Sequence, residues 1–190
     1  MMINANGVYK VLESKSTYIY NIGDIVSQDN IYINSKMSNK RLMLGFYSMV
    51  IFKIVGFKIN GNIIWNKGEV QSKRNSTPNR FPGYLKPINV YEHAIIFQKD
   101  INKKLETRII ELSPVIKINN KKENTYGHTA PYPIELAELI IPFVKKNYVL
   151  DPFLGSGSTL VAMSKHGIKS VGIEINSDYY SLAIDRVEKN

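Results

Sequence analysis

The chain has 190 residues, which suits one domain of ordinary size, and its 44% hydrophobic content excludes a disordered composition. Lys and Arg number 25 against 16 Asp and Glu, and the resulting net charge of +9 is spread along the chain. This distributed positive charge favours a polyanionic partner such as nucleic acid; charge that only keeps the protein in solution is the simpler alternative. The absence of cysteine excludes disulfides, cysteine zinc sites and thiol catalysis.

The first half of the chain combines predicted strands with one helix and one basic loop. Residues 17–22, TYIYNI, mix β-branched and aromatic side chains and predict a strand. Residues 40–56 carry apolar side chains at helical spacing and end at a glycine, which predicts a helix. Further strands are predicted at 61–65 and 90–98, on either side of a polar, basic loop at 67–86.

After a polar, irregular stretch at 99–127, the pattern becomes regular. A helix, a strand, a glycine-containing turn, a helix, a strand and a final helix capped by Ser177 are predicted, in this order, at residues 134–146, 148–151, 152–157, 158–165, 170–175 and 178–189. This order indicates a parallel sheet with crossover helices. We therefore expect the α/β class, with the earlier strands in the same sheet.

The segment VLDPFLGSGSTLVAMSKHGIKSVGIEI carries the most functional information. Asp151 ends the first strand, and Gly155 and Gly157 let the backbone turn sharply because they have no Cβ. The next helix directs its free N–H groups into the same space. Glu174 ends the second strand, where an acid accepts hydrogen bonds from ribose hydroxyls in doubly wound sheets. An adenosine-bearing ligand is predicted; a plain strand–turn–helix without a ligand is the alternative.

Charge and glycine spacing indicate which ligand fits. A dinucleotide fingerprint needs a third glycine where this chain has Leu160, and Asp151 would repel a pyrophosphate. The same carboxylate suits a cation, and S-adenosylmethionine carries a sulfonium and an ammonium group. The sequence therefore predicts S-adenosylmethionine as cofactor and disfavours a nucleotide-dependent oxidoreductase.

DPFLGSGST, followed by GIEI, resembles the cofactor motifs of DNA methyltransferases that act on exocyclic amino groups. The upstream GHTAPYPIEL resembles the helix-leading motif of that family, and this order resembles its beta class. The resemblance implies a doubly wound, mostly parallel Rossmann-like methyltransferase sheet, incomplete at its N-terminal part. It assigns cofactor contacts to Asp151, Pro152, Phe153, Gly155, Ser156, Gly157, Ser158, Thr159 and Glu174, together with His128, Ala130, Pro131 and Tyr132.

The first half resembles the same family less specifically. NGVYKVLESKSTYIYNIGDI is similar to the stretch after the catalytic motif, and GFKINGNIIWNKG and YEHAIIFQK are similar to the later strands that close the sheet. We expect one methyltransferase domain over residues 1–190, with closing strands in 1–98, a small irregular insert in 99–127 and the cofactor-binding half in 128–190.

The basic loop at 67–86 is predicted to face double-stranded DNA. It carries Lys and Arg side chains with a single acid, Glu69. Cations suit phosphates, amides and hydroxyls suit base edges, and aromatic rings can stack where a base has left the duplex. A solvated surface loop anchored by its aromatic side chains is the alternative. The predicted DNA contacts are Lys73, Arg74, Asn79, Arg80, Phe81 and Tyr84.

No two of the eight prolines are adjacent. Methyltransferases of the family that this chain resembles use an Asp, Asn or Ser followed by Pro-Pro and an aromatic residue. The polar residue binds the target amino group, and the aromatic residue stacks on the flipped base. We therefore assign no catalytic residue, and we expect a fragment or subunit with a complementary methyltransferase fragment or subunit as partner. A non-catalytic DNA-binding or regulatory module is the alternative, and the choice between cytosine N4 and adenine N6 stays open.

The N-terminal residues contain no apolar core of signal-peptide length, and the longest apolar runs are far too short to span a bilayer. With no cysteine, a reducing cytoplasm is the expected location, without a membrane partner. His93, His128 and His166 lie far apart in the sequence, so no metal site is expected.

Overall fold

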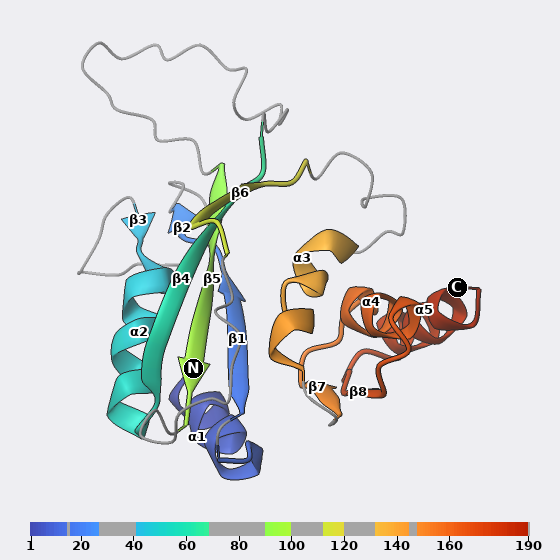
Figure 1. The fold of residues 1–190 in the computed structure, drawn as a ribbon, viewed down its shortest axis with the longest axis horizontal. Coiled ribbons are helices and arrows are strands. Elements are labelled where there is room, and N and C mark those ends of the chain that lie inside the picture. The colour runs from blue at the N-terminus through green and yellow to red at the C-terminus, as the bar shows by residue number, and fades with distance from the viewer. Residues whose placement is uncertain are drawn as a thin grey trace. The chain divides into compact units, whose positions relative to one another are not determined.

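The structure, a computed structural model, describes residues 1–14, 16–26, 41–68, 90–99, 112–119, 132–144 and 148–189 (Figure 1). The chain divides into two compact units, Met1–Lys117 and Ile118–Asn190. The division falls within the stretch predicted as an insert between the two halves. A single domain over the whole chain remains a prediction.

The first unit is built around a four-stranded sheet with the order β1-β5-β4-β6. Both β1 and β4 are antiparallel to β5, and β6 is parallel to β4, so three strands share one direction and β5 alone is reversed. The sheet is therefore mixed, with the reversed strand β5 between β1 and β4. The elements are α1 (Met2–Val11), β1 (Thr17–Ile22), β2 (Ile25–Val26), β3 (Arg41–Leu42), α2 (Leu44–Val55), β4 (Lys58–Asn66), β5 (Tyr91–Gln98) and β6 (Val115–Lys117).

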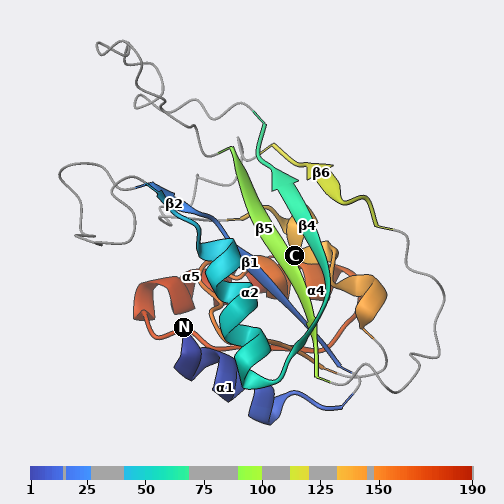
Figure 2. The same cartoon turned by 90° about the vertical axis from the view of Figure 1, so that its left-hand side faces the viewer.

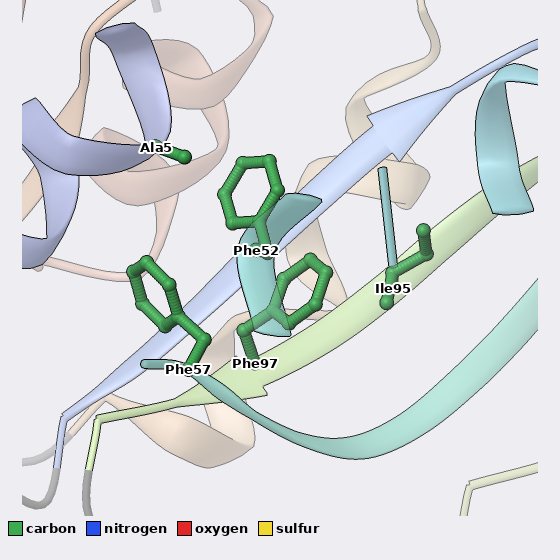
Figure 3. Packing of buried hydrophobic residues seen from close by; sticks show 5 residues of the cluster. All are labelled: Ala5, Phe52, Phe57, Ile95 and Phe97. Carbon is green, nitrogen blue, oxygen red and sulfur yellow. The ribbon is translucent and has the colours of Figure 1, made fainter. Parts of the chain in front are cut away.

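Helices α1 and α2 cover one face of this sheet (Figure 2). Ile95 and Phe97 alternate along β5 and point to that face, as the two-residue period of a strand requires. They pack with Ala5, Phe52 and Phe57 in a core of fully buried side chains (Figure 3). The Phe52 and Phe97 rings stack with centroids 4.6 Å apart. Burial of each such side chain stabilises the unit by about 1.5–3 kcal/mol.

The second unit contains two parallel strands joined by a helix. β7 and β8 pair in parallel, and α4 forms the crossover between them. Val149 of β7 packs with Ala137, Ala162 and Met163, so α3 and α4 share one small core with the strand. The elements are α3 (Ile134–Glu138), the 3-10 turn η2 (Ile141–Phe143), β7 (Val149–Asp151), α4 (Ser158–Lys165), β8 (Ser170–Gly172) and α5 (Ser177–Glu188).

Several details differ from the sequence-based expectation. The strand predicted at 170–175 is shorter, since β8 ends at Gly172, and Glu174 follows the strand instead of lying in it. The predicted helix at 134–146 ends early as α3 followed by a 3-10 turn, because Pro142 lacks the N–H that a continuing helix needs. The stretch predicted to be irregular contains the short strand β6. The last helix is capped by Asn176, whose side chain accepts hydrogen bonds from two backbone N–H groups, and Ser177 is its first residue.

Within the described residues, β7 and β8 form a sheet of their own, whereas the earlier strands form the four-stranded sheet and the pair β2–β3. None of the helices in these residues has the length and hydropathy needed to cross a bilayer.

Candidate cofactor site

The glycine turn joins the carboxyl end of β7 to the start of α4. The Gly157 N–H donates to the Leu154 carbonyl at 3.0 Å, which closes a tight turn. Gly155 and Gly157 have φ of 54° and 86°, in the left-handed region that favours glycine. A Cβ on Gly157 would lie 2.9 Å from the Cβ of Ala183 in α5. Gly157 is therefore required by its backbone conformation and by the close approach of α5.

Asp151 organises the first part of the turn. Its Oδ1 accepts the Phe153 N–H at 2.9 Å, and its Oδ2 accepts the Thr159 hydroxyl at 2.5 Å and the Tyr132 hydroxyl at 3.3 Å. The Tyr132 and Thr159 hydroxyls also contact each other. Burial raises the pKa of Tyr132, and the negative charge of Asp151 adds to that rise. The phenol therefore stays protonated and acts as a donor.

Glu174 follows β8 and binds the same turn from a second strand. Its Oε2 accepts the Gly155 N–H at 2.7 Å, and its Oε1 accepts the Asn176 N–H at 2.8 Å. The Leu154 N–H donates to the Ile173 carbonyl at 2.9 Å, so the turn and the end of β8 are bonded through the main chain as well. Both carboxylates thus lie at the carboxyl ends of parallel strands, where open α/β sheets bind ligands.

Large apolar side chains stand exposed next to these carboxylates. Phe153 in the turn is 56% exposed, and Ile173 and Ile175, on either side of Glu174, are 55% and fully exposed. Exposed apolar surface of this size costs free energy in water unless a partner covers it.

Arg186 lies on the other side of the turn and is not among the residues that the sequence predicts for the site. It is 5% exposed, and its Nη1 donates to the Ser156 carbonyl at 2.7 Å and to the Ser156 hydroxyl at 3.0 Å. A signal was present in the sequence. Tyr179, Leu182, Ala183, Arg186 and Val187 follow helical i, i+3, i+4 spacing, which puts an arginine on the core-facing side of α5.

The structure brings together Asp151, Tyr132, Thr159, Gly155 and Glu174 through the bonds described above. The predicted hydroxyl contacts are buried and bonded within the protein: Ser156 to Arg186, Ser158 to the Tyr132 carbonyl at 2.8 Å, and Thr159 to Asp151. Pro152 lies in the turn, half-buried. Outside the described residues lie His128, Ala130, Pro131, Lys73, Arg74, Asn79, Arg80, Phe81 and Tyr84.

Among the residues that the structure describes, no group of three or more His, Cys, Asp or Glu side chains is arranged to hold a metal ion. The site is instead built from a βαβ unit, a glycine turn and a carboxylate after the second strand. These features define a Rossmann-like α/β protein with a nucleoside-binding type of site.

Comparison with known proteins identifies the family. The sequence profile described as DNA methylase, for N6 and N4 methyltransferases, matches residues 5–185, and the chain belongs to this family. It is 40% identical over 194 residues to the Type II beta methyltransferase M.BslI of Bacillus sp. (strain NEB-606), across 94% of this chain and 21% of M.BslI. It is 30% identical over 147 residues to the Type II methyltransferase M.SmaI of Serratia marcescens, across 70% of this chain and 47% of M.SmaI. The chain thus spans about a fifth to a half of these relatives.

Solved structures show the same fold. The cytosine-N4-specific PvuII DNA methyltransferase has a TM-score of 0.72 at 20% identity, across 96% of this chain and 67% of its own. The M1.HpyAVI–SAM complex has a TM-score of 0.70 at 19% identity, across 98% of this chain and 81% of its own. The predicted Rossmann-like methyltransferase fold is therefore confirmed.

A pair of glycine substitutions tests the close approach at the turn. Gly157 and Gly167 both have positive φ, but a Cβ would meet Ala183 only at Gly157 and would meet nothing within 4 Å at Gly167. Gly167→Ala should lower the free energy of unfolding by about 1–2 kcal/mol, the cost of a side chain in the left-handed backbone conformation. Gly157→Ala should cost about 1–3 kcal/mol more from overpacking. Equal losses of stability for the two variants, measured by urea unfolding, would contradict the close contact between Gly157 and Ala183.

Proposed function

We propose that this chain binds S-adenosylmethionine at the glycine turn and serves as the cofactor-binding and DNA-contacting part of a Type II amino-group DNA methyltransferase. The observation that carries the proposal is the Glu174 carboxylate, bonded to the Gly155 N–H and flanked by exposed apolar side chains. Family membership supports the reaction class. The M1.HpyAVI structure, solved as a SAM complex, supports the cofactor.

The residues of the turn fit the chemistry of this ligand. The Glu174 carboxylate is bonded to the Gly155 and Asn176 N–H groups at the edge of the turn, and a carboxylate, with several acceptor positions, suits the hydroxyls of a ribose. Phe153, Ile173 and Ile175 offer apolar surface for adenine. Asp151 supplies negative charge toward the sulfonium and ammonium groups. We propose the predicted cofactor contacts as the binding set, with Ser156, Ser158 and Thr159 supporting the turn through their internal bonds.

Replacing Glu174 tests the cofactor assignment. Glu174→Gln keeps an oxygen for the Gly155 N–H but removes the charge, so the affinity for S-adenosylmethionine should fall roughly ten- to a hundredfold, as for a lost charge-assisted hydrogen bond. Calorimetry measures it. Glu188→Gln, the same charge change at an exposed position of α5, is the control and should bind like wild type. Equal affinity in all three proteins, or tighter wild-type binding of NAD, would exclude the assignment.

We also propose that the basic loop contacts double-stranded DNA through Lys73, Arg74, Asn79, Arg80, Phe81 and Tyr84. The net charge of +9 supports a polyanionic partner. The loop follows the carboxyl end of β4, and β1 and β6 end in the same direction. In open α/β sheets ligands bind at that edge, which favours a loop that begins there.

The salt dependence of DNA binding tests the loop. Arg74→Ala and Arg80→Ala should each weaken binding and lower the log–log salt slope by about 1, because each removes one phosphate contact. Lys58→Ala removes one exposed charge at the opposite end of β4 and should leave the slope unchanged. Slopes are read from fluorescence anisotropy titrations at several salt concentrations. If the two arginine variants behave like Lys58→Ala, the loop is not the DNA surface.

The catalytic tetrapeptide, we propose, comes from outside these 190 residues, on a complementary methyltransferase fragment or subunit. No two prolines of this chain are adjacent, so the Pro-Pro element has to be supplied elsewhere. In the proposed reaction the exocyclic amino nitrogen of cytosine or adenine gains the methyl group, the C–S bond of the cofactor breaks, and one proton leaves the nitrogen. The cofactor supplies the methyl group, and this chain binds the cofactor.

Complementation tests this division. The chain alone should transfer no tritiated methyl group to DNA, and adding a polypeptide with the Pro-Pro-aromatic segment of the same system should restore transfer. The control is the same polypeptide with its first proline replaced by alanine. Methyl transfer by the chain alone would refute the external tetrapeptide. Persistent inactivity of the mixture, with DNA binding intact, would favour a non-catalytic DNA-binding or regulatory module.

A further inference from the structure

Arg186 occupies a position where an apolar side chain would be expected. It lies on the face of α5 that also carries Ala183, and both residues are buried. Burying a guanidinium is costly because the charge leaves water, and buried arginines persist where strong hydrogen bonds compensate. The bonds that Arg186 makes therefore indicate what it does.

Two of these bonds hold one residue of the glycine turn. The same nitrogen, Nη1, donates to the main-chain carbonyl and to the side-chain hydroxyl of Ser156. The carbonyl is thereby turned toward α5, and the peptide that follows it leads into Gly157, where the turn contacts Ala183. Arg186 and Ala183 together fix the Ser156–Gly157 peptide from one side.

The charge of Arg186 also acts on the other side of the turn. Burial and Asp151 raise the pKa of Tyr132, and the positive charge of Arg186 opposes that rise. The guanidinium is thus electrostatically close to the hydrogen-bonded group of Tyr132, Thr159 and Asp151. One buried side chain therefore acts on both the shape of the turn and the charge around it.

We infer that Arg186 is a positioning residue for the cofactor: by holding the Ser156 peptide it keeps the turn in the shape that receives the charged amino-acid end of S-adenosylmethionine. The inference rests on the proposed function. In that placement Glu174 meets the ribose, and the turn and Asp151 meet the methionine part. Loss of Arg186 therefore disturbs one end of the ligand and leaves the adenosine end in place.

A comparison of two ligands tests this role. Methylthioadenosine keeps the adenosine and the sulfur but lacks the charged amino-acid end. Arg186→Met should weaken the binding of S-adenosylmethionine tenfold or more and change the affinity for methylthioadenosine less than threefold. Arg186→Lys keeps a charged donor and should recover part of the loss. Ser156→Ala removes only the hydroxyl acceptor and should show a smaller loss of the same kind. Calorimetry gives both affinities.

The control is Lys189→Met, which removes an exposed cation from the end of the same helix and should bind both ligands like wild type. Urea unfolding without ligand identifies a variant that fails to fold; if Arg186→Met fails, Arg186→Lys and Ser156→Ala carry the test. Wild-type affinities in the folded variants would overturn the role of Arg186 and leave the proposed function standing. Equal losses for both ligands would indicate a merely structural role. If the wild-type protein does not bind S-adenosylmethionine, both the role of Arg186 and the proposed function are wrong.

Discussion

The shape of the glycine turn depends on three charged side chains that bind its main chain from outside. Asp151 at the end of β7 accepts the Phe153 N–H, Glu174 after β8 accepts the Gly155 N–H, and Arg186 of α5 donates to the Ser156 carbonyl. A tight turn cannot pair these groups in a helix or sheet, and leaving them unpaired would cost free energy. Side chains from three elements therefore stabilise one short segment.

This arrangement makes the turn ready for a ligand before one binds. Because Ser156, Ser158 and Thr159 use their hydroxyls for internal bonds, the turn does not have to be ordered by the cofactor, which reduces the entropic cost of binding. Charge then selects among nucleoside ligands. Asp151 and Glu174 put two carboxylates next to the turn, an arrangement that opposes a pyrophosphate and suits a cation.

Much of the fold could be predicted because its patterns are local. The strand at 17–22 and the helix at 158–165 have the predicted bounds, since strand composition and a glycine start are visible in the sequence. The places of Asp151 at the end of β7 and of Glu174 shortly after β8 were also predictable, because the motif fixes their spacing, although the predicted strand at 170–175 was too long. Arg186 was not predicted, because its role depends on the packing of α5 against the turn. The three residues of β6 are too few to show a period, and their pairing with β4 is non-local.

The two functional segments follow one rule of α/β sheets. The basic loop begins where β4 ends, and the glycine turn begins where β7 ends, so each follows the carboxyl end of a strand. Strands at these places give rigid support, while the connecting segments carry the specific chemistry. In the first unit β5 alone runs against the others, so β1, β4 and β6 end toward the edge that the loop leaves. The same principle thus accounts for the place of the basic segment in one unit and of the glycine turn in the other.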